Sequence, residues 1–193
     1  MIKRFFKGAA VLLLAGLLVA CDNNTPLMEQ VVAADPKGVA VELAKGGDIN
    51  ARNSFGWTAL THAARIGNVE MVTLLLDNGA DVNTVDDTSW SPLLRAAMKG
   101  HTEVVKVLLA RGADVHHVDN GKWTALHWAA QQGKGEIMRL LIDAGADLNA
   151  QTEDGWTPRM VAQNEGHTDL ANLISRWMTM PVCLNNEICN KGI

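Results

Sequence analysis

The sequence predicts an all-α solenoid, in which short helix pairs stack side by side behind a cleaved leader. Three observations predict this fold class. The chain repeats with a period of 33 residues from about residue 48 to residue 167, each repeat holds two short apolar helical patterns, and helix-capping residues flank these patterns. One such unit is too short to bury its own apolar faces, so its stability must come from its neighbours.

The 33-residue period recurs at four positions of the unit, and all four series keep the same phase. Independent series in phase do not arise by chance. Their members are Trp57, Trp90, Trp123 and Trp156; Asp48, Asp81, Asp114 and Asp147; Gly67, Gly100, Gly133 and Gly166; and Gly79, Gly112 and Gly145.

Each unit predicts a first helix, a second helix and a connecting finger. Thr58 suits a helix N-cap and Gly67 a left-handed helix end, and Ser91 before Pro92 gives the next unit the same start. Valines and leucines between residues 69 and 76 then follow at helical spacing. The polar stretches between units, such as residues 81–89, favour a turn or hairpin.

The residues of the unit resemble the ankyrin repeat. Gly112-Ala113-Asp114 and Thr124-Ala125-Leu126-His127 match the glycine-alanine-aspartate and threonine-proline-leucine-histidine signatures of that family. The resemblance implies an ankyrin solenoid with β-hairpin fingers, four complete or nearly complete units and an N-terminal cap. The expected organisation is a signal peptide (1–20), a tether (21–26), a capping repeat (27–55), ankyrin repeats (56–178) and a tail (179–193).

The sequence also departs from the family pattern. Arg159 stands where the family has a buried leucine, as expected of a terminal repeat with one face in water. Thr61, Leu94 and Met160 replace the histidine of the signature. We therefore expect the local hydrogen bond of that histidine to be missing in those units.

The first twenty residues predict an export signal. Three basic residues precede an uncharged apolar run, residues 9–20, that is shorter than the roughly 20 residues a membrane span requires. Residues 18–21 resemble the lipobox of bacterial lipoproteins, which implies cleavage before Cys21, a diacylglycerol on its thiol and a further acyl chain on its amine. The alternatives are an ordinary secretory signal with a chance cysteine and a short helix of the folded domain.

Asp22 resembles the signal that retains enteric lipoproteins in the inner membrane. We therefore expect a periplasm-facing lipoprotein, with the inner membrane favoured over the outer. Loss of the leader removes three of the 17 Lys and Arg and none of the 21 Asp and Glu, which leaves a net charge of about −7. Such a surface repels phosphate, so no binding to nucleic acid is expected.

Two further cysteines, Cys183 and Cys189, lie in the tail after the last helical pattern. An oxidising periplasm would allow them to form a disulfide. Free thiols and a zinc pair are the alternatives. Zinc is disfavoured because the nearest histidine, His167, is distant in sequence.

A stack of repeats suits a protein partner, because equivalent positions form a row on a rigid, curved frame without a deep pocket. By the geometry that the resemblance implies, the row combines finger residues with the exposed side of each first helix. Trp128 is the foremost anchor, since Trp and Arg dominate binding hot spots. The expected partner-binding residues are Trp57, His62, Arg65, Trp90, Arg95, Met98, Trp123, Trp128 and Gln131.

The periodic tryptophans have two interpretations: they pack at the finger base and stiffen the stack, or they form an aromatic ladder for the partner. Their strict recurrence favours packing, and both roles are compatible. His116 and His117 are predicted to be surface residues and not metal ligands, and His127 to be structural.

Catalytic motifs are not found: no nucleophile elbow, phosphate loop, paired zinc ligands or dinucleotide fingerprint. We therefore expect no enzymatic activity, no cofactor and no metal, and a monomer that binds an unidentified protein. The candidate roles are an immunity protein that neutralises a toxin or phospholipase effector, an accessory factor for a periplasmic enzyme such as a catalase, and an envelope scaffold.

Overall fold

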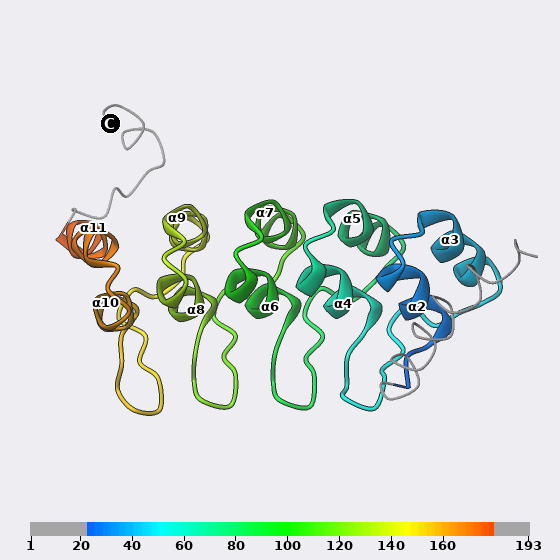
Figure 1. Ribbon diagram of the computed structural model, residues 1–193, viewed down its shortest axis with the longest axis horizontal. Helices are drawn as coiled ribbons and strands as arrows, with labels where there is room; N and C mark the ends of the chain where they lie inside the picture. Colours follow the sequence, from blue (N-terminus) through cyan, green and yellow to red (C-terminus); the bar gives the residue numbers. More distant parts are fainter. Residues whose placement is uncertain (1–22, 180–193) are drawn as a thin grey trace, which may run out of the picture.

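The computed structural model describes residues 23–179, and this part of the chain forms a single row of antiparallel helix pairs (Figure 1). The predicted fold class is confirmed. Cys21, Asp22, Cys183 and Cys189 lie outside the described residues. The pairs are α2 (Pro26–Val32) with α3 (Pro36–Ala44), α4 (Ala59–Ile66) with α5 (Val69–Asp77), α6 (Pro92–Lys99) with α7 (Thr102–Ala110), α8 (Ala125–Gln131) with α9 (Gly135–Asp143), and α10 (Pro158–Asn164) with α11 (Thr168–Thr179).

The helices form two layers, with a continuous core between them. In the layer of first helices α4 packs against α6 and α6 against α8, and in the layer of second helices α5 packs against α7. Paired alanines of the first helices, such as Ala63 and Ala64, are fully buried and allow this close approach. The second helices contribute larger side chains at the same period, namely Leu75, Leu108 and Leu141.

Side-chain caps begin the first helices, as predicted. The hydroxyls of Thr58 and Ser91 accept hydrogen bonds from N–H groups three residues later, at 3.2 and 3.3 Å. Helix α4 ends at Gly67, whose φ of +85° is left-handed. A Cβ at Gly67 would lie 2.5 Å from His101 Nδ1, so this glycine also permits the close approach of the next repeat.

One expectation about the caps is wrong. Thr61 retains the reciprocal bond that the family histidine makes, because its Oγ1 accepts from the Thr58 N–H at 3.4 Å. The short hydroxyl side chain reaches the cap as the imidazole does. At Leu94 and Met160 the bond that remains is the one from the backbone N–H to the capping hydroxyl.

Three histidines connect neighbouring repeats. His101 Nε2 lies 3.1 Å from the Arg65 carbonyl, and His167 Nε2 lies 3.1 Å from the Gln131 carbonyl. His127 Nε2 lies 3.0 Å from the carbonyl of Trp156, while its Nδ1 accepts from the Thr124 N–H at 3.2 Å. The proton of His127 is therefore on Nε2, and the structural role predicted for this residue is confirmed.

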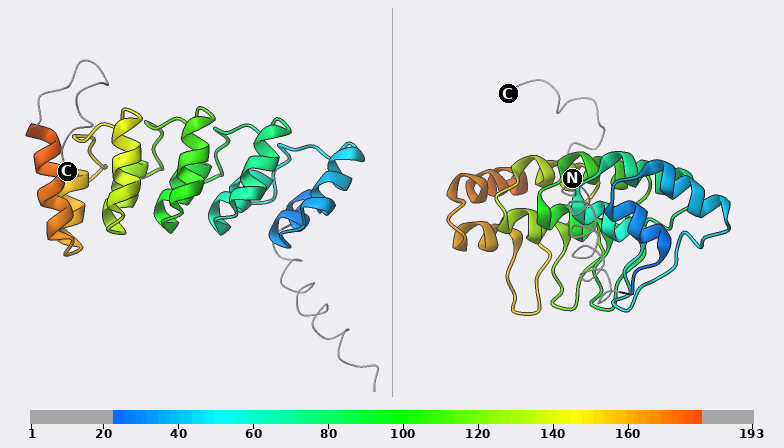
Figure 2. Two further views of the ribbon diagram at one scale, coloured as in Figure 1. Left: turned by 90° about the horizontal axis from the view of Figure 1, so that it is seen from above. Right: turned by 45° about the vertical axis from the view of Figure 1, so that its right-hand side comes forward.

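The fingers project from one edge of the row, beside the first helices (Figure 2). Each closes with a backbone bond such as Asp86 N–H to Trp90 O at 3.0 Å. Within residues 23–179 these loops form no regular strand, and a single β-bridge joins Val118 to Thr124. No helix in this range is both long enough and apolar enough to cross a membrane.

Candidate functional site

A buried polar side chain shapes each finger. These residues stand 33 apart and are at most 8% exposed: Asn53, Asp86, Asp119 and Thr152. In the first three, one side-chain oxygen accepts N–H bonds from the residues two and four positions later, at 2.9 to 3.0 Å. The donor four positions later is the periodic tryptophan. The buried residue therefore fixes the backbone from which each indole projects.

The second oxygen of each buried carboxylate binds a residue of the following first helix. Asp86 forms an ion pair with the guanidinium of Arg95. Asp119 Oδ2 accepts a hydrogen bond from the indole Nε1 of Trp128 at 3.1 Å. Two of the predicted partner-binding residues, Arg95 and Trp128, are thus held in place by finger carboxylates.

The first finger has a different arrangement, because Asn24 lies between the finger residue Asn53 and His62, which stands at the position of Arg95 and Trp128. Asn24 Oδ1 accepts from Asn53 Nδ2 at 2.8 Å and lies 3.2 Å from His62 Nε2. The exposure expected of His62 is not found: this side chain is 2% exposed. Its ring meets Trp57 edge to face, with centroids 5.0 Å apart.

Arginine and tryptophan side chains from three units form a continuous row of ring–ring and cation–ring contacts. Arg95 lies between Trp57 and Trp90, with its Cζ 4.5 and 4.7 Å from the two ring centroids. Trp128 lies between Trp90 and Trp123, with its centroid 4.6 Å from each. We call this row the Trp/Arg ladder; with Arg65, whose Cζ lies 5.2 Å from the Trp57 centroid, its members are Arg65, Trp57, Arg95, Trp90, Trp128 and Trp123.

The ladder does not extend to the fourth periodic tryptophan. Val161 stands at the position of Arg95 and Trp128, and its small side chain is 3% exposed. Trp156 is therefore left outside the row and is 37% exposed. Trp57, Trp90 and Trp123 are half-buried, so they pack as the first interpretation expected and still present an edge to solvent.

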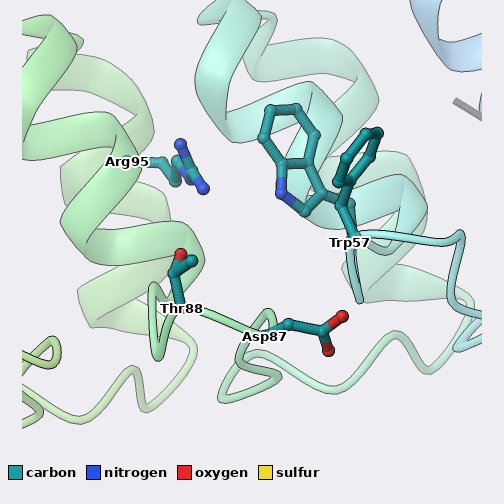
Figure 3. Close-up of a pocket in the computed structure, with 5 residues that line it drawn as sticks. Trp57, Asp87, Thr88 and Arg95 are labelled. Atoms are coloured by element: carbon teal, nitrogen blue, oxygen red, sulfur yellow. The ribbon is translucent and has the colours of Figure 1, made fainter.

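An open pocket of about 350 Å³ lies at one end of the ladder, between the first two fingers. Its lining residues are Phe55, Trp57, Asp87, Thr88 and Arg95. In Figure 3 the guanidinium of Arg95 points toward the Trp57 indole, whereas the carboxylate of Asp87 points away from Arg95. The pocket therefore has an aromatic wall and a separate acidic rim.

Comparison with known families agrees with this geometry. A family model for ankyrin repeats in three copies matches residues 17–119 and 111–178. The chain belongs to the ankyrin-repeat family. No curated protein matches the sequence. Membership indicates a module for protein–protein interaction, and ankyrin-repeat proteins are in general not catalysts.

Two further candidate residues of this ankyrin-repeat protein, Met98 and Gln131, stand at the position of Arg65 in the next two units. Met98 and Gln131 are half-buried near the ends of α6 and α8. His116 is exposed, while His117 Nε2 lies 2.7 Å from the Ser89 carbonyl. Across residues 23–179, no group of three or more His, Cys, Asp and Glu side chains is placed to hold a metal ion.

The Asp86–Arg95 pair is charged at neutral pH. Burial alone would raise the pKa of Asp86, but hydrogen bonds from Thr88, Arg95 and the Trp90 N–H outweigh burial and lower this pKa below its ordinary value of 3.8. The side chains of Asp86 and Arg95 are 1% and 15% exposed, so water screens the pair weakly.

Asp86 and Asp119 are site residues that sequence reasoning missed. Their phase was a usable signal, because each stands four residues before a periodic tryptophan. The turn predicted for stretches such as residues 81–89 does not single them out, since Asp is common in polar loops. Their burial depends on the neighbouring first helix, which a single finger sequence does not contain.

Proposed function

We propose that this ankyrin-repeat protein is a non-enzymatic module that holds a protein partner against its fingers and first helices. In this proposal, lipid attached to Cys21 anchors the module at the periplasmic face of a bacterial membrane. The observation that carries the binding role is the Trp/Arg ladder, a row of half-buried indoles and guanidinium groups that spans three repeats.

The ladder suits binding for two reasons. Tryptophan and arginine are the residues most enriched among binding hot spots. The buried carboxylates of Asp86 and Asp119 also hold Arg95 and Trp128 in one orientation before any partner arrives. Less side-chain entropy is then lost on association.

The location rests on the leader. Its basic start, its short apolar run and the lipobox-like residues before Cys21 support export and acylation, and Asp22 supports retention in the inner membrane. An inhibitor of a toxin or phospholipase effector is one concrete form of this function. A gene for an effector next to this one would support that form, whereas an adjacent catalase gene would favour the accessory role.

A crosslinked pull-down from envelope fractions, read by mass spectrometry, tests the proposal. The variant Arg65→Ala combined with Met98→Ala changes the rim of the row and leaves the buried ion pair intact. We expect it to weaken capture at least tenfold, about 1.4 kcal/mol. Arg139→Ala on α9, whose side chain is 71% exposed, is the matched control and should capture as the native protein does. Equal capture by both variants would remove the ladder face from the proposal.

A further inference from the structure

The pocket between the first two fingers has an aromatic wall that the finger fold does not require. Phe55 is 51% exposed. The equivalent positions of the other fingers hold Thr88, Gly121 and Asp154, so the turn forms without an aromatic side chain. Within the described part of the chain no cation or ring stacks on Phe55, whereas Trp57 already contacts two arginines. The Phe55 ring is thus the face that remains open to a ligand.

The charges that line the pocket differ in how firmly they are neutralised. Arg95 is held by Asp86, whose side chain is 1% exposed, and this pair leaves no net charge to repel an incoming cation. Asp87 pairs instead with Arg52, with 3.1 Å between Nη2 and Oδ1, and these side chains are 62% and 47% exposed. Exposed pairs contribute little and are screened by salt. Asp87 is therefore the carboxylate that a ligand can reach, and a ligand cation can replace Arg52 as its partner.

Arg52 shows which chemical group this carboxylate accepts. Its guanidinium lies on Asp87 at the edge of the pocket, and a ligand cation would take its place. An arginine fits better than a lysine, because its planar guanidinium stacks on an aromatic ring and pairs with both carboxylate oxygens. Arg95, whose Cζ lies 4.5 Å from the Trp57 centroid and 4.7 Å from the Trp90 centroid, shows that aromatic rings of this protein contact a guanidinium group.

The acidic residues of the fingers around the pocket also favour a positively charged ligand. The four fingers, residues 47–57, 80–90, 113–123 and 146–156, contain nine Asp and Glu against two Lys and Arg. The field along the finger edge therefore attracts a basic surface and raises the association rate of a basic partner.

We propose that this pocket receives an arginine side chain of the protein partner, which stacks on Phe55 and displaces Arg52 from Asp87. The proposal rests on the proposed protein-binding function and adds the chemistry of the contact. It requires a basic segment on the partner, lying along the acidic fingers.

Blocked tripeptides provide the test without knowledge of the partner. Gly-Arg-Gly, Gly-Lys-Gly, Gly-Phe-Gly and Gly-Glu-Gly are titrated at constant ionic strength into the purified full-length protein, and NMR follows the Phe55 ring and the Trp57 indole. We expect the arginine peptide to give saturable shifts and to bind more tightly than the other three. Phe55→Ser and Asp87→Asn should each weaken this binding several-fold.

The decisive variant is Arg52→Gln. Since it removes the internal competitor, it should tighten binding of the arginine peptide by about two- to fivefold, the range set by an exposed ion pair. The control is Arg111→Gln, because Arg111, which follows α7, forms a similar exposed pair with Asp77 at the end of α5, at 2.7 Å. It should leave the affinity unchanged.

Three outcomes would overturn the inference: tighter binding of the phenylalanine peptide, equal affinity in Arg52→Gln and the native protein, or equal affinity in Asp87→Asn and the native protein. None of these outcomes bears on the pull-down, which identifies a partner whatever side chain enters the pocket. A failed pull-down likewise leaves the titration result standing.

Discussion

At the scale of single residues, His127 links pH to stability. Burial lowers the pKa of His127 below its ordinary value of 6.5, although its bond to the Trp156 carbonyl acts in the opposite direction. The unfolded chain therefore binds a proton that the folded chain does not, and the free energy of unfolding falls as pH drops below about 6.5. We expect the urea midpoint to be flat above this pH and to decrease below it. His127→Gln, which cannot titrate, should reduce the slope, and an unchanged slope would assign it to another group.

The Asp86–Arg95 pair gives a second prediction at this scale. Arg95→Leu should lower the free energy of unfolding by about 3 kcal/mol or more, because it leaves a buried carboxylate without its cation. Adding Asp86→Asn should recover much of this loss, since Asn53 accepts the same two N–H bonds in the first finger. Urea denaturation of both single variants and the double variant measures the coupling. Additive losses would show that the pair contributes nothing specific.

At the scale of the elements, the helices and fingers could be predicted from sequence because their signals are local. Caps such as Thr58, helix ends such as Gly67 and the apolar spacing all lie within one unit. The contents of the site could not be predicted in the same way. The buried His62 contacts Asn24, 38 residues earlier, and the ladder depends on contacts between residues of different units. The 33-residue repeat shows which residues occupy equivalent positions in the units, but only the packing of the folded chain shows which of these side chains are buried.

Substitutions at two helix-ending glycines distinguish the cost of backbone strain from the cost of a steric clash. Gly67 and Gly79 have φ values of +85° and +89°, but a Cβ at Gly67 would meet the His101 ring at 2.5 Å, whereas a Cβ at Gly79 meets nothing within 4 Å. Each change to alanine should cost about 1 kcal/mol for the left-handed conformation. Gly67→Ala should cost about 1 kcal/mol more, because His101 must move away from the Arg65 carbonyl. Equal thermal stability of the two variants would contradict this account.

At the scale of the whole molecule, the proposed lipid anchor and one end of the Trp/Arg ladder both lie near the first finger. Asn24 bonds to Asn53 and His62, so the chain enters the stack beside that finger. Cys21 is three residues earlier, and three residues span at most about 11 Å. A lipid on Cys21 would therefore hold the first finger, and the pocket beside it, close to the membrane surface.

Fractionation of cells tests this arrangement. Cys21→Ala should move the protein from the membrane fraction to the soluble fraction. Without a cysteine at position 21 the exported protein carries no acyl chains, and in this proposal the acyl chains are what bind it to the membrane. Cys183→Ala, which changes a cysteine of the tail, should remain with the membrane. Circular dichroism of both variants should keep the helical spectrum, since the described helix pairs lie within residues 23–179 and contain neither substitution. If Cys21→Ala stays in the membrane fraction, the first finger has no lipid beside it, and the partner need not be at the membrane surface.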